Sequence, residues 1–370
     1  MARRLIFIPV ALALLLGAGA SRASDRQSLA TQCDPAMQGC FQLVSTIAFS
    51  STRDHVSDDP ALTPPLLGAE AYLINPDMTN PRRLTDNSAF DGFAALSSDG
   101  KKIVFDSTRY TGSLNSSDLF LMNTDGTEQT LLLHGSSATW SADSKNIAFH
   151  ASASGTGTPL RTDPGSATSD SDIFVVNVDD LLAGVAQPRN LTNSPDKIDD
   201  DADWSPDGQT IVYTAHDLGD EGPNWPLRPF ISNTAEIYVR NADGTGTPTR
   251  LTYNDEEERG PSWSPDGSQI TFACRVGGGT ADFEICVMNA DGSDRVQLTD
   301  NSVADLTPTW SPDGQHILFH RTVGGAGSGN QQLFIMNADG TQQTQVTFGT
   351  TTSGDGVNNL ANWGELRVKA

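Results

Sequence analysis

The sequence has few basic residues. Its 370 residues contain 23 Lys and Arg against 46 Asp and Glu, which gives a formal net charge of −23 at pH 7. Nucleic acids and anionic membrane surfaces are bound through Lys and Arg, because these residues neutralise phosphate groups. The shortage of basic residues therefore excludes nucleic acid as an expected partner and favours a cationic one.

Long hydrophobic runs are also lacking after the N-terminus. The run at residues 5–20 follows Arg3 and Arg4 and is shorter than the roughly 20 residues that span a bilayer. A basic start, an apolar run and small residues are typical of a secretory signal peptide. We expect residues 1–23 to be this signal, with a membrane anchor as the alternative. The mature chain is then periplasmic or extracellular, without stable membrane insertion.

Cysteine is scarce, with four residues in the chain. Neither neighbouring pair has the spacing to histidine that a zinc site needs. An exported protein folds in an oxidising compartment, which permits disulfides. Cys33 and Cys40 lie in an irregular stretch, and Cys274 and Cys286 lie in consecutive predicted strands. We expect the disulfides Cys33–Cys40 and Cys274–Cys286.

Catalytic motifs are missing as well. There is no Gly-x-Ser-x-Gly nucleophile elbow. The six histidines show no pair at the spacing of a metal site or a catalytic triad. The sequence therefore predicts no catalytic residues and no cofactor, apart from the calcium considered below.

The chain does contain a repeat. Residues 309–320, TWSPDGQHILFH, recur as SWSPDGSQITFA at 262–273 and as DWSPDGQTIVYT at 203–214. Six copies of a longer unit align, each with a segment like ITFA, a segment like EICVMN, a turn and a last short strand. The first strand of the unit carries a tryptophan in most copies: Trp140, Trp204, Trp263, Trp310 and Trp363.

These segments have the pattern of half-buried strands. They are short, alternate apolar with polar residues and are rich in Ile, Val, Phe and Tyr. Asp-Gly pairs between them supply the positive backbone angles of tight hairpins. One four-stranded unit needs neighbours to cover its faces, so six copies predict an all-β, six-bladed β-propeller of four-stranded antiparallel blades. The first copy lacks its Trp strand and the chain ends on one, so we expect the C-terminal strand to close the ring.

The repeats resemble the WD-like Pro-Asp repeats of the TolB propeller family, over roughly residues 45–365. The best copies contain PSWSPDGSQITF and PTWSPDGQHILF. The resemblance implies a six-bladed propeller and a protein partner in the cell envelope. TolB itself adds an N-terminal α/β domain, whereas in this sequence about 20 residues separate the expected signal from the first expected blade. We expect three parts: the signal at 1–23, a segment with the Cys33–Cys40 pair at 24–44, and the propeller at 45–370.

Acidic residues recur five positions before the Trp position of the repeat. We call this set the acidic collar: Asp91, Asp199, Glu258 and Asp305. Ring symmetry would bring the collar to the channel mouth, on the face with the long variable loops. We predict that the collar binds a cation or a basic peptide. The alternative is that nearby arginines neutralise it: Arg53, Arg109, Arg275 and Arg321.

Two further features suggest binding. Asp199, Asp201 and Asp203 alternate along one predicted strand and could offer oxygen ligands to calcium, with a solvated acidic link as the alternative. Trp225 and Arg228 lie on a long loop and are residue types typical of contact anchors, although the loop could instead pack on its own blade.

Together these patterns predict a monomeric, non-enzymatic scaffold that binds a protein or peptide in the cell envelope or outside the cell. The alternative is a propeller enzyme, a lyase or hydrolase acting on a carbohydrate or peptide at the central channel. Such an enzyme needs convergent His, Arg and acidic residues, and the sequence shows no aligned histidine. Fold resemblance by itself does not decide between these functions.

Overall fold

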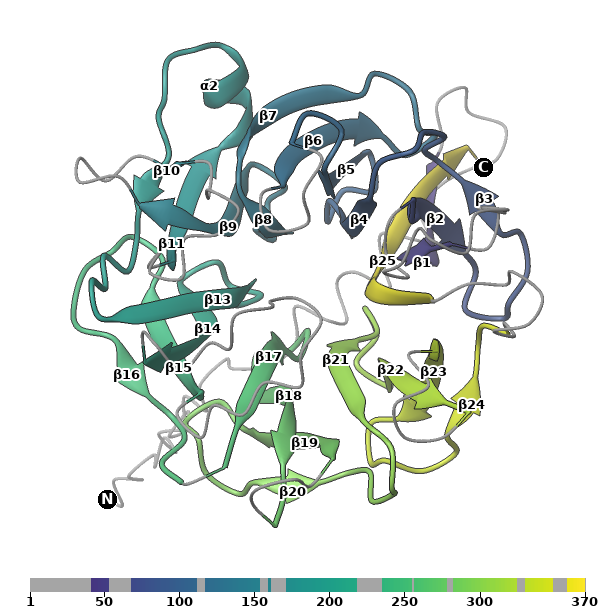
Figure 1. The fold of residues 1–370 in the computed structure, drawn as a ribbon, viewed down its shortest axis with the longest axis vertical. Coiled ribbons are helices and arrows are strands. Elements are labelled where there is room, and N and C mark those ends of the chain that lie inside the picture. The colour runs from purple at the N-terminus through teal and green to yellow at the C-terminus, as the bar shows by residue number, and fades with distance from the viewer. Residues whose placement is uncertain are drawn as a thin grey trace, which may run out of the picture.

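The computed structural model describes residues 41–52, 68–111, 117–153, 159–160, 171–217, 235–254, 256–277, 282–324, 330–348 and 358–369. These residues form an all-β propeller, whose sheets are arranged around a common centre (Figure 1). One short helix, α2 (Val178–Leu182), lies within these ranges. No helix of the described residues is long and apolar enough to cross a membrane.

Four of the sheets have four strands each, as expected for a propeller blade. In hydrogen-bonding order, the first is β25 (Asn358–Lys369), β1 (Phe41–Ser51), β2 (Glu70–Ile74) and β3 (Arg82–Arg83). The second is β4 (Asp91–Leu96), β5 (Lys102–Ser107), β6 (Asp118–Asn123) and β7 (Thr130–His134). The third is β17 (Glu258–Trp263), β18 (Gln269–Arg275), β19 (Phe283–Asn289) and β20 (Val296–Gln297). The fourth is β21 (Asp305–Trp310), β22 (His316–Val323), β23 (Asn330–Asn337) and β24 (Thr344–Gln345).

The remaining strands form one nine-stranded sheet, which differs from the six separate blades that the sequence predicts. Its strands are β8 (Ser136–Trp140), β9 (Asn146–Ala153), β10 (Pro159–Leu160), β11 (Ser171–Asn177), β12 (Arg189–Asn190), β13 (Lys197–Trp204), β14 (Thr210–Asp217), β15 (Glu236–Asn241) and β16 (Thr249–Arg250). The sheet is continuous because Ser171 of β11 pairs in parallel with Ile198 of β13. The prediction of six separate four-stranded sheets is corrected to four such blades and one larger sheet.

The C-terminal strand pairs with the first strand of the chain, as the repeat pattern predicts. β25 and β1 run antiparallel from Phe41 opposite Lys369 to Ser51 opposite Asn358. Trp363 lies opposite Ile47, and its indole Nε1 donates a hydrogen bond to Ser45 Oγ at 2.7 Å. β1 starts at Phe41, four residues before the predicted propeller boundary at residue 45, and that boundary stays a prediction.

The tryptophans pack between neighbouring sheets. Trp310 of β21 shares an apolar cluster with Ile285 of the preceding sheet. Trp363 shares another with Leu318 and Leu333. Each of these tryptophans is almost completely buried, so its ring loses most of its contact with water and stabilises the contact between sheets.

The predicted disulfide Cys274–Cys286 is present. The two residues lie diagonally across β18 and β19, with a Cα–Cα distance of 5.8 Å. The predicted Cys33–Cys40 bridge lies outside the described residues.

The Asp-Gly turns also pack against the neighbouring sheet. Gly292 has a φ of +86°, and a Cβ atom there would lie 2.7 Å from the carbonyl oxygen of Leu251, the residue that follows β16. Glycine is needed at this turn both for its backbone conformation and for the close approach.

Candidate functional site

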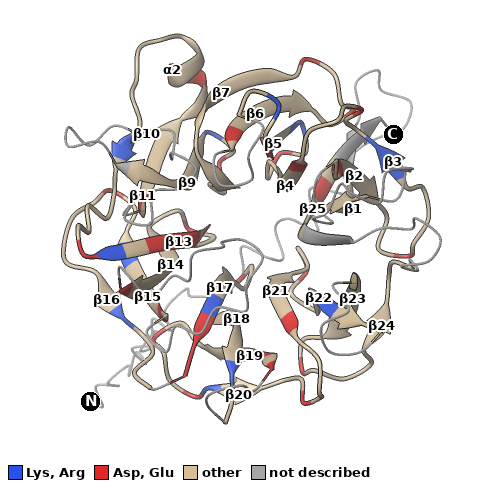
Figure 2. Ribbon diagram, viewed as in Figure 1, with Lys and Arg blue, Asp and Glu red and all other residues tan. Residues whose placement is uncertain are grey.

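The acidic collar lies at the start of the inner strands. Asp91, Glu258 and Asp305 begin β4, β17 and β21, and Asp199 is the third residue of β13 (Figure 2). All four residues are fully buried. They do not form an open ring of carboxylates at the channel mouth, so any charge that they carry must be compensated inside the protein.

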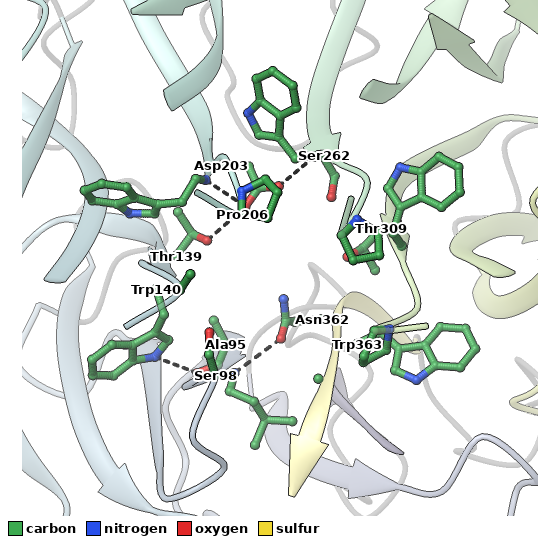
Figure 3. A pocket seen from close by; sticks show the side chains of 18 of the residues that line it. Ala95, Ser98, Thr139, Trp140, Asp203, Pro206, Ser262, Thr309, Asn362 and Trp363 are labelled. Carbon is green, nitrogen blue, oxygen red and sulfur yellow. Dashed lines mark hydrogen bonds between the residues drawn. The ribbon is translucent and has the colours of Figure 1, made fainter. Parts of the chain in front are cut away.

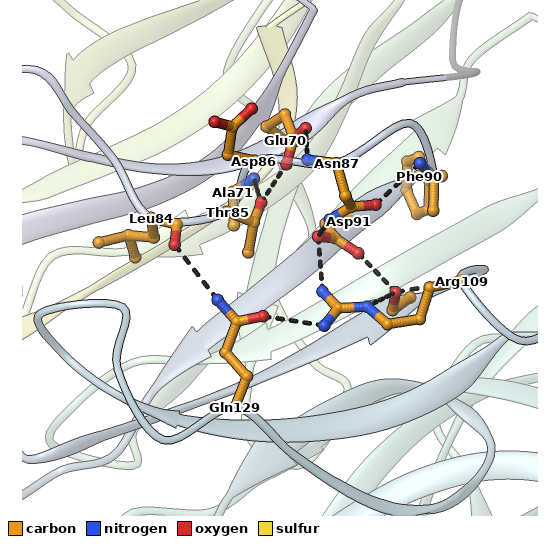
Figure 4. Close-up of polar contacts among 12 residues, drawn as sticks. Glu70, Ala71, Leu84, Thr85, Asp86, Asn87, Phe90, Asp91, Arg109 and Gln129 are labelled. Atoms are coloured by element: carbon orange, nitrogen blue, oxygen red, sulfur yellow. Dashed lines mark hydrogen bonds and ion pairs between the residues drawn. The ribbon is translucent and has the colours of Figure 1, made fainter.

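Two collar residues are neutralised by an arginine of their own blade. Arg109 NH2 lies 2.8 Å from Asp91 Oδ2 (Figure 4). The hydroxyl of Ser107 donates to the same carboxylate. Arg321 binds Asp305 with both arms of its guanidinium, Nε to Oδ1 at 2.7 Å and NH2 to Oδ2 at 2.6 Å. Such charge-assisted pairs satisfy a buried carboxylate well, so the alternative interpretation holds at these two positions.

Glu258 has a different partner from the one that the sequence suggested. Its Oε1 accepts a hydrogen bond from Asn254 Nδ2 at 2.7 Å and lies 3.1 Å from Arg295 NH1. Arg275 instead pairs with Glu257, the residue before Glu258: Arg275 NH1 lies 3.0 Å from Glu257 Oε2. Burial raises the pKa of Glu258 to about 7, although Asn254 and Arg295 oppose this shift.

Asp199 differs from the other three collar residues. It lies opposite Ala215 in the sheet, whereas Asp305 lies opposite Arg321. Neither carboxylate oxygen of Asp199 has a hydrogen-bond partner in good geometry among the described residues, although the hydroxyl groups of Thr192 and Ser194 lie close enough to interact with it. Burial raises the pKa of Asp199 to about 7, although nearby hydroxyl groups offset part of the effect.

The nearest base to Asp199 along the chain has another partner. Lys197 Nζ lies 2.9 Å from Asp217 Oδ1, and both of these side chains are partly exposed. Within the part of the chain that the structure describes, Asp199 is therefore a fully buried acid with no ion pair.

The proposed calcium ligands do not share one face of β13. The register of β13 with β14 shifts between Asp200 and Asp203, and Asp201 has a φ of +51°. Because this bulge breaks the alternation, Asp199 points into the packing while Asp203 accepts a hydrogen bond from the backbone N–H of Trp263 at 2.8 Å. Among the described residues, no group of three or more His, Cys, Asp or Glu could hold a metal ion.

The same bulge recurs in the inner strands β4, β8, β13, β17 and β21. The residues that take a positive φ there, from +45° to +58°, are Phe93, Ser137, Asp201, Gly260 and Thr307. Bulges of this kind bend a strand and redirect its side chains. The spacing of the repeat does not predict these bulges, because the bulged residues differ in type.

A buried group of ionisable residues, which the sequence pattern did not predict, lies beside the bulges of β13 and β17. His216 Nε2 is 3.7 Å from Asp200 Oδ2, and Arg259 Nε donates to Glu257 Oε1. Burial raises the pKa of Asp200, but His216 and Arg259 outweigh it and leave the pKa below its ordinary value. Arg259 and Glu257 therefore form an ion pair inside the propeller, beside Asp200.

Two histidines do share a repeat position. His150 and His320 each follow the Ile that recurs at the start of the second strand of the repeat, Ile147 or Ile317, by three residues. Burial lowers the pKa of both, to about 4 for His320, so both are neutral at pH 7. Aligning the second strands would have revealed this register from the sequence.

Some predicted binding residues lie outside the described residues. These are Arg53, Trp225 and Arg228. Their roles stay predictions.

Comparison with known proteins agrees with this fold. Residues 229–363 match the family described as TolB beta propeller domain. The structure of TolB from Acinetobacter baumannii is similar, with a TM-score of 0.62 and 17% identity, over 86% of this chain and 66% of that one. A protein of Agrobacterium tumefaciens assigned to TolB has a TM-score of 0.55 and 18% identity, over 88% of this chain and 100% of that one.

An enzyme also shares the fold. A puromycin-hydrolyzing peptidase of Mycobacterium tuberculosis has a TM-score of 0.50 and 14% identity, over 76% of this chain and 41% of that one. At these identities the structures support the fold and leave the activity open. The family match at residues 229–363 and the similarity to the two TolB structures support a TolB-like β-propeller family for this chain.

Proposed function

We propose that this protein is an exported, non-enzymatic scaffold that binds a protein or peptide segment with basic side chains at the collar end of the propeller. The observation that supports this proposal is the state of Asp199. The other three collar carboxylates each have an arginine partner, and Asp199 has none among the described residues. A buried carboxylate without a cation either stays protonated or requires a counter-charge.

A basic side chain of a partner would supply that charge. Because Asp199 is fully buried, the basic side chain of a partner reaches it only when the residues that cover it move aside. The net charge of −23 would steer a basic partner toward the protein and speed its association.

The proposal includes a closed ring of six blades. The nine-stranded sheet divides naturally between β11 and β13, because a single pair, Ser171 with Ile198, joins its two halves. The pairing of β25 with β1 supports closure by the C-terminal strand. A closed ring leaves no sheet edge at the junction of the two chain ends.

The proposed location is the periplasm or the extracellular space. The disulfide Cys274–Cys286 fits an oxidising compartment, and the basic, apolar start of the sequence fits a cleaved signal peptide. We propose that the mature protein is monomeric there and that its partner is an envelope or secreted protein. Mass spectrometry of the exported protein, with the N-terminus read directly, tests the cleavage.

Calorimetric titration at low salt tests the binding. The probe is an acetylated, arginine-rich peptide, and the variants are Asp199→Asn and, as a control of equal charge change, Asp243→Asn. Asp243 lies on an exposed turn, and its carboxylate only caps that turn. We expect Asp199→Asn to weaken peptide binding about tenfold, the typical effect of losing one charged hydrogen bond, and Asp243→Asn to leave it unchanged.

Two results would count against this proposal. Equal peptide affinity of the wild type and Asp199→Asn would place the site elsewhere. Binding of calcium that Asp199→Asn abolishes, without any binding of the peptide, would assign the position to an ion.

A second candidate function is a lyase or hydrolase acting on a carbohydrate or peptide at the channel. The convergence of His216, Asp200 and Arg259 favours it, because these residue types serve acid–base chemistry. His216 is completely buried, so a substrate would need an opening there. Turnover of an oligosaccharide or peptide that His216→Asn abolishes, with unchanged stability, would support the enzyme over the scaffold.

A further inference from the structure

The inner strands end around a cavity of about 180 Å³ on the face of the Ser-Pro-Asp-Gly turns (Figure 3). This face lies at the opposite end of the inner strands from the acidic collar. The residue before each Trp position lines the cavity: Ala95, Thr139, Asp203, Ser262, Thr309 and Asn362. The cavity is thus built from one position of the repeat, and most of its members are polar.

The charge of this cavity is negative. Asp203 and Glu365 are the only charged side chains among the described residues that line it. Asp203 Oδ2 accepts from the backbone N–H of Trp263 at 2.8 Å, and Oδ1 accepts from Trp204 N at 3.0 Å and from Thr139 Oγ1 at 3.2 Å. Burial raises the pKa of Asp203 to about 6, so the carboxylate is charged at neutral pH.

The negative charge of Asp203 is not needed for the contact between blades. Asn362 occupies the same repeat position in β25, and its Oδ1 accepts from the backbone N–H of Leu96 at 3.3 Å, as Asp203 accepts from Trp263. Asn362 and Asp203 lie on different sides of the opening (Figure 3). A neutral amide can therefore make this contact, and the carboxylate adds only a charge that faces the cavity.

The surroundings of Asp203 favour an organic cation over a metal ion. Both of its oxygens already accept hydrogen bonds, and no group of three or more metal-ligating acids or histidines lies among the described residues. Calcium needs six or more oxygen ligands, whereas a primary ammonium carries one charge and three N–H donors. The hydroxyls of Thr139, Ser262 and Thr309 line the same cavity and can accept such donors.

We propose that the cavity on the turn face binds a primary ammonium group, with Asp203 as its counter-ion and the surrounding hydroxyls as acceptors. The group belongs to a small amine or to a lysine side chain. The site does not depend on the collar, because the two lie at opposite ends of β13.

Calorimetric titration at low salt tests this proposal with three probes. Butane-1,4-diamine represents a free amine, and N-acetyl-lysine methylamide represents a lysine side chain. Tetramethylammonium carries the same charge as one ammonium group but has no N–H donor. We expect at least one of the two amines to bind the wild type and tetramethylammonium not to bind. The amine that binds more tightly identifies the source of the ammonium group.

Three variants assign the binding to the cavity. Asp203→Asn keeps an acceptor for Trp263 and removes the charge, so we expect about tenfold weaker amine binding. Asn362→Asp adds a second carboxylate without losing the acceptor for Leu96, so we expect tighter binding. Asp243→Asn removes a charge from an exposed turn outside the cavity and serves as the matched control, with unchanged binding.

The outcomes separate clearly. Absence of amine binding in both the wild type and Asn362→Asp overturns the proposal, as does equal binding by the wild type and Asp203→Asn. Binding of tetramethylammonium as tight as that of the amines overturns the assigned hydrogen bonds. An acetylated peptide rich in arginine carries no primary ammonium, so its binding at the collar succeeds or fails independently of these results.

Discussion

Asp199 and Asp305 occupy the same repeat position, yet replacing them by asparagine should change stability in opposite directions. Asp305 forms a bidentate pair with Arg321, whose side chain is 16% exposed. Asp305→Asn would leave that guanidinium without its counter-charge, and breaking a buried pair in this way costs about 3–5 kcal/mol. Asp199 has no ion pair among the described residues, so Asp199→Asn removes a charge that the interior disfavours.

The magnitude for Asp199 follows from its pKa. Burial raises this pKa from the ordinary 3.8 to about 7. The folded protein therefore keeps a proton that the unfolded chain releases between about pH 4 and pH 7, so the free energy of unfolding falls as the pH rises through this window. One pKa unit corresponds to about 1.4 kcal/mol, so the loss approaches roughly 4 kcal/mol above pH 7. Asparagine at position 199 does not titrate and avoids this loss.

Urea unfolding at pH 5 and pH 8 measures both effects. We expect Asp199→Asn to be more stable than the wild type at pH 8 and to lose less stability between the two pH values. The loss of stability between pH 5 and pH 8 that remains in the variant comes from other buried acids with a raised pKa, such as Asp106 and Glu258. Asp243→Asn should behave like the wild type. The reasoning would be refuted if Asp199→Asn were less stable than the wild type at pH 8 and lost as much free energy of unfolding between pH 5 and pH 8 as the wild type does.

Three further changes test the propeller itself. Trp363→Ala should lower the free energy of unfolding by about 3–5 kcal/mol, because it leaves a cavity in a buried contact between sheets, and Trp363→Phe should lower it less. Equal urea midpoints for both variants and the wild type would contradict closure by β25. Replacing Cys274 and Cys286 by serine should lower the free energy of unfolding by about 3 kcal/mol, because the unfolded chain is no longer constrained by a short closed loop. Added reductant should then leave the urea midpoint of this variant unchanged. Gly292→Ala should destabilise the protein through both its φ of +86° and the approach to Leu251, and an unchanged thermal midpoint would show that the turn adjusts freely.

The sequence by itself determined the strands and their order. Alternating apolar residues and Asp-Gly turns are local signals, so they predict hairpins without knowledge of the rest of the fold. The missing Trp strand at the start and the extra one at the end predicted the pairing of β25 with β1, because the repeat leaves no other partner for either. The disulfide Cys274–Cys286 was predictable for the same reason: both residues belong to one hairpin.

Tertiary structure decided the charges of the site. A repeat position places Asp91, Asp199 and Asp305 alike, but whether an arginine reaches each carboxylate depends on its neighbours in space. Arg321 lies opposite Asp305, and Arg109 reaches Asp91 from beyond the strand end, whereas Ala215 lies opposite Asp199. The bulge in β13 cannot be derived from alternation, and it breaks the single face that Asp199, Asp201 and Asp203 would otherwise share. The pairing of Ser171 with Ile198, which merges two expected blades into one sheet, likewise depends on two segments meeting in space. Local sequence patterns determine which segments form strands. The neutralisation of a buried charge depends on neighbouring residues that only the assembled sheets bring together.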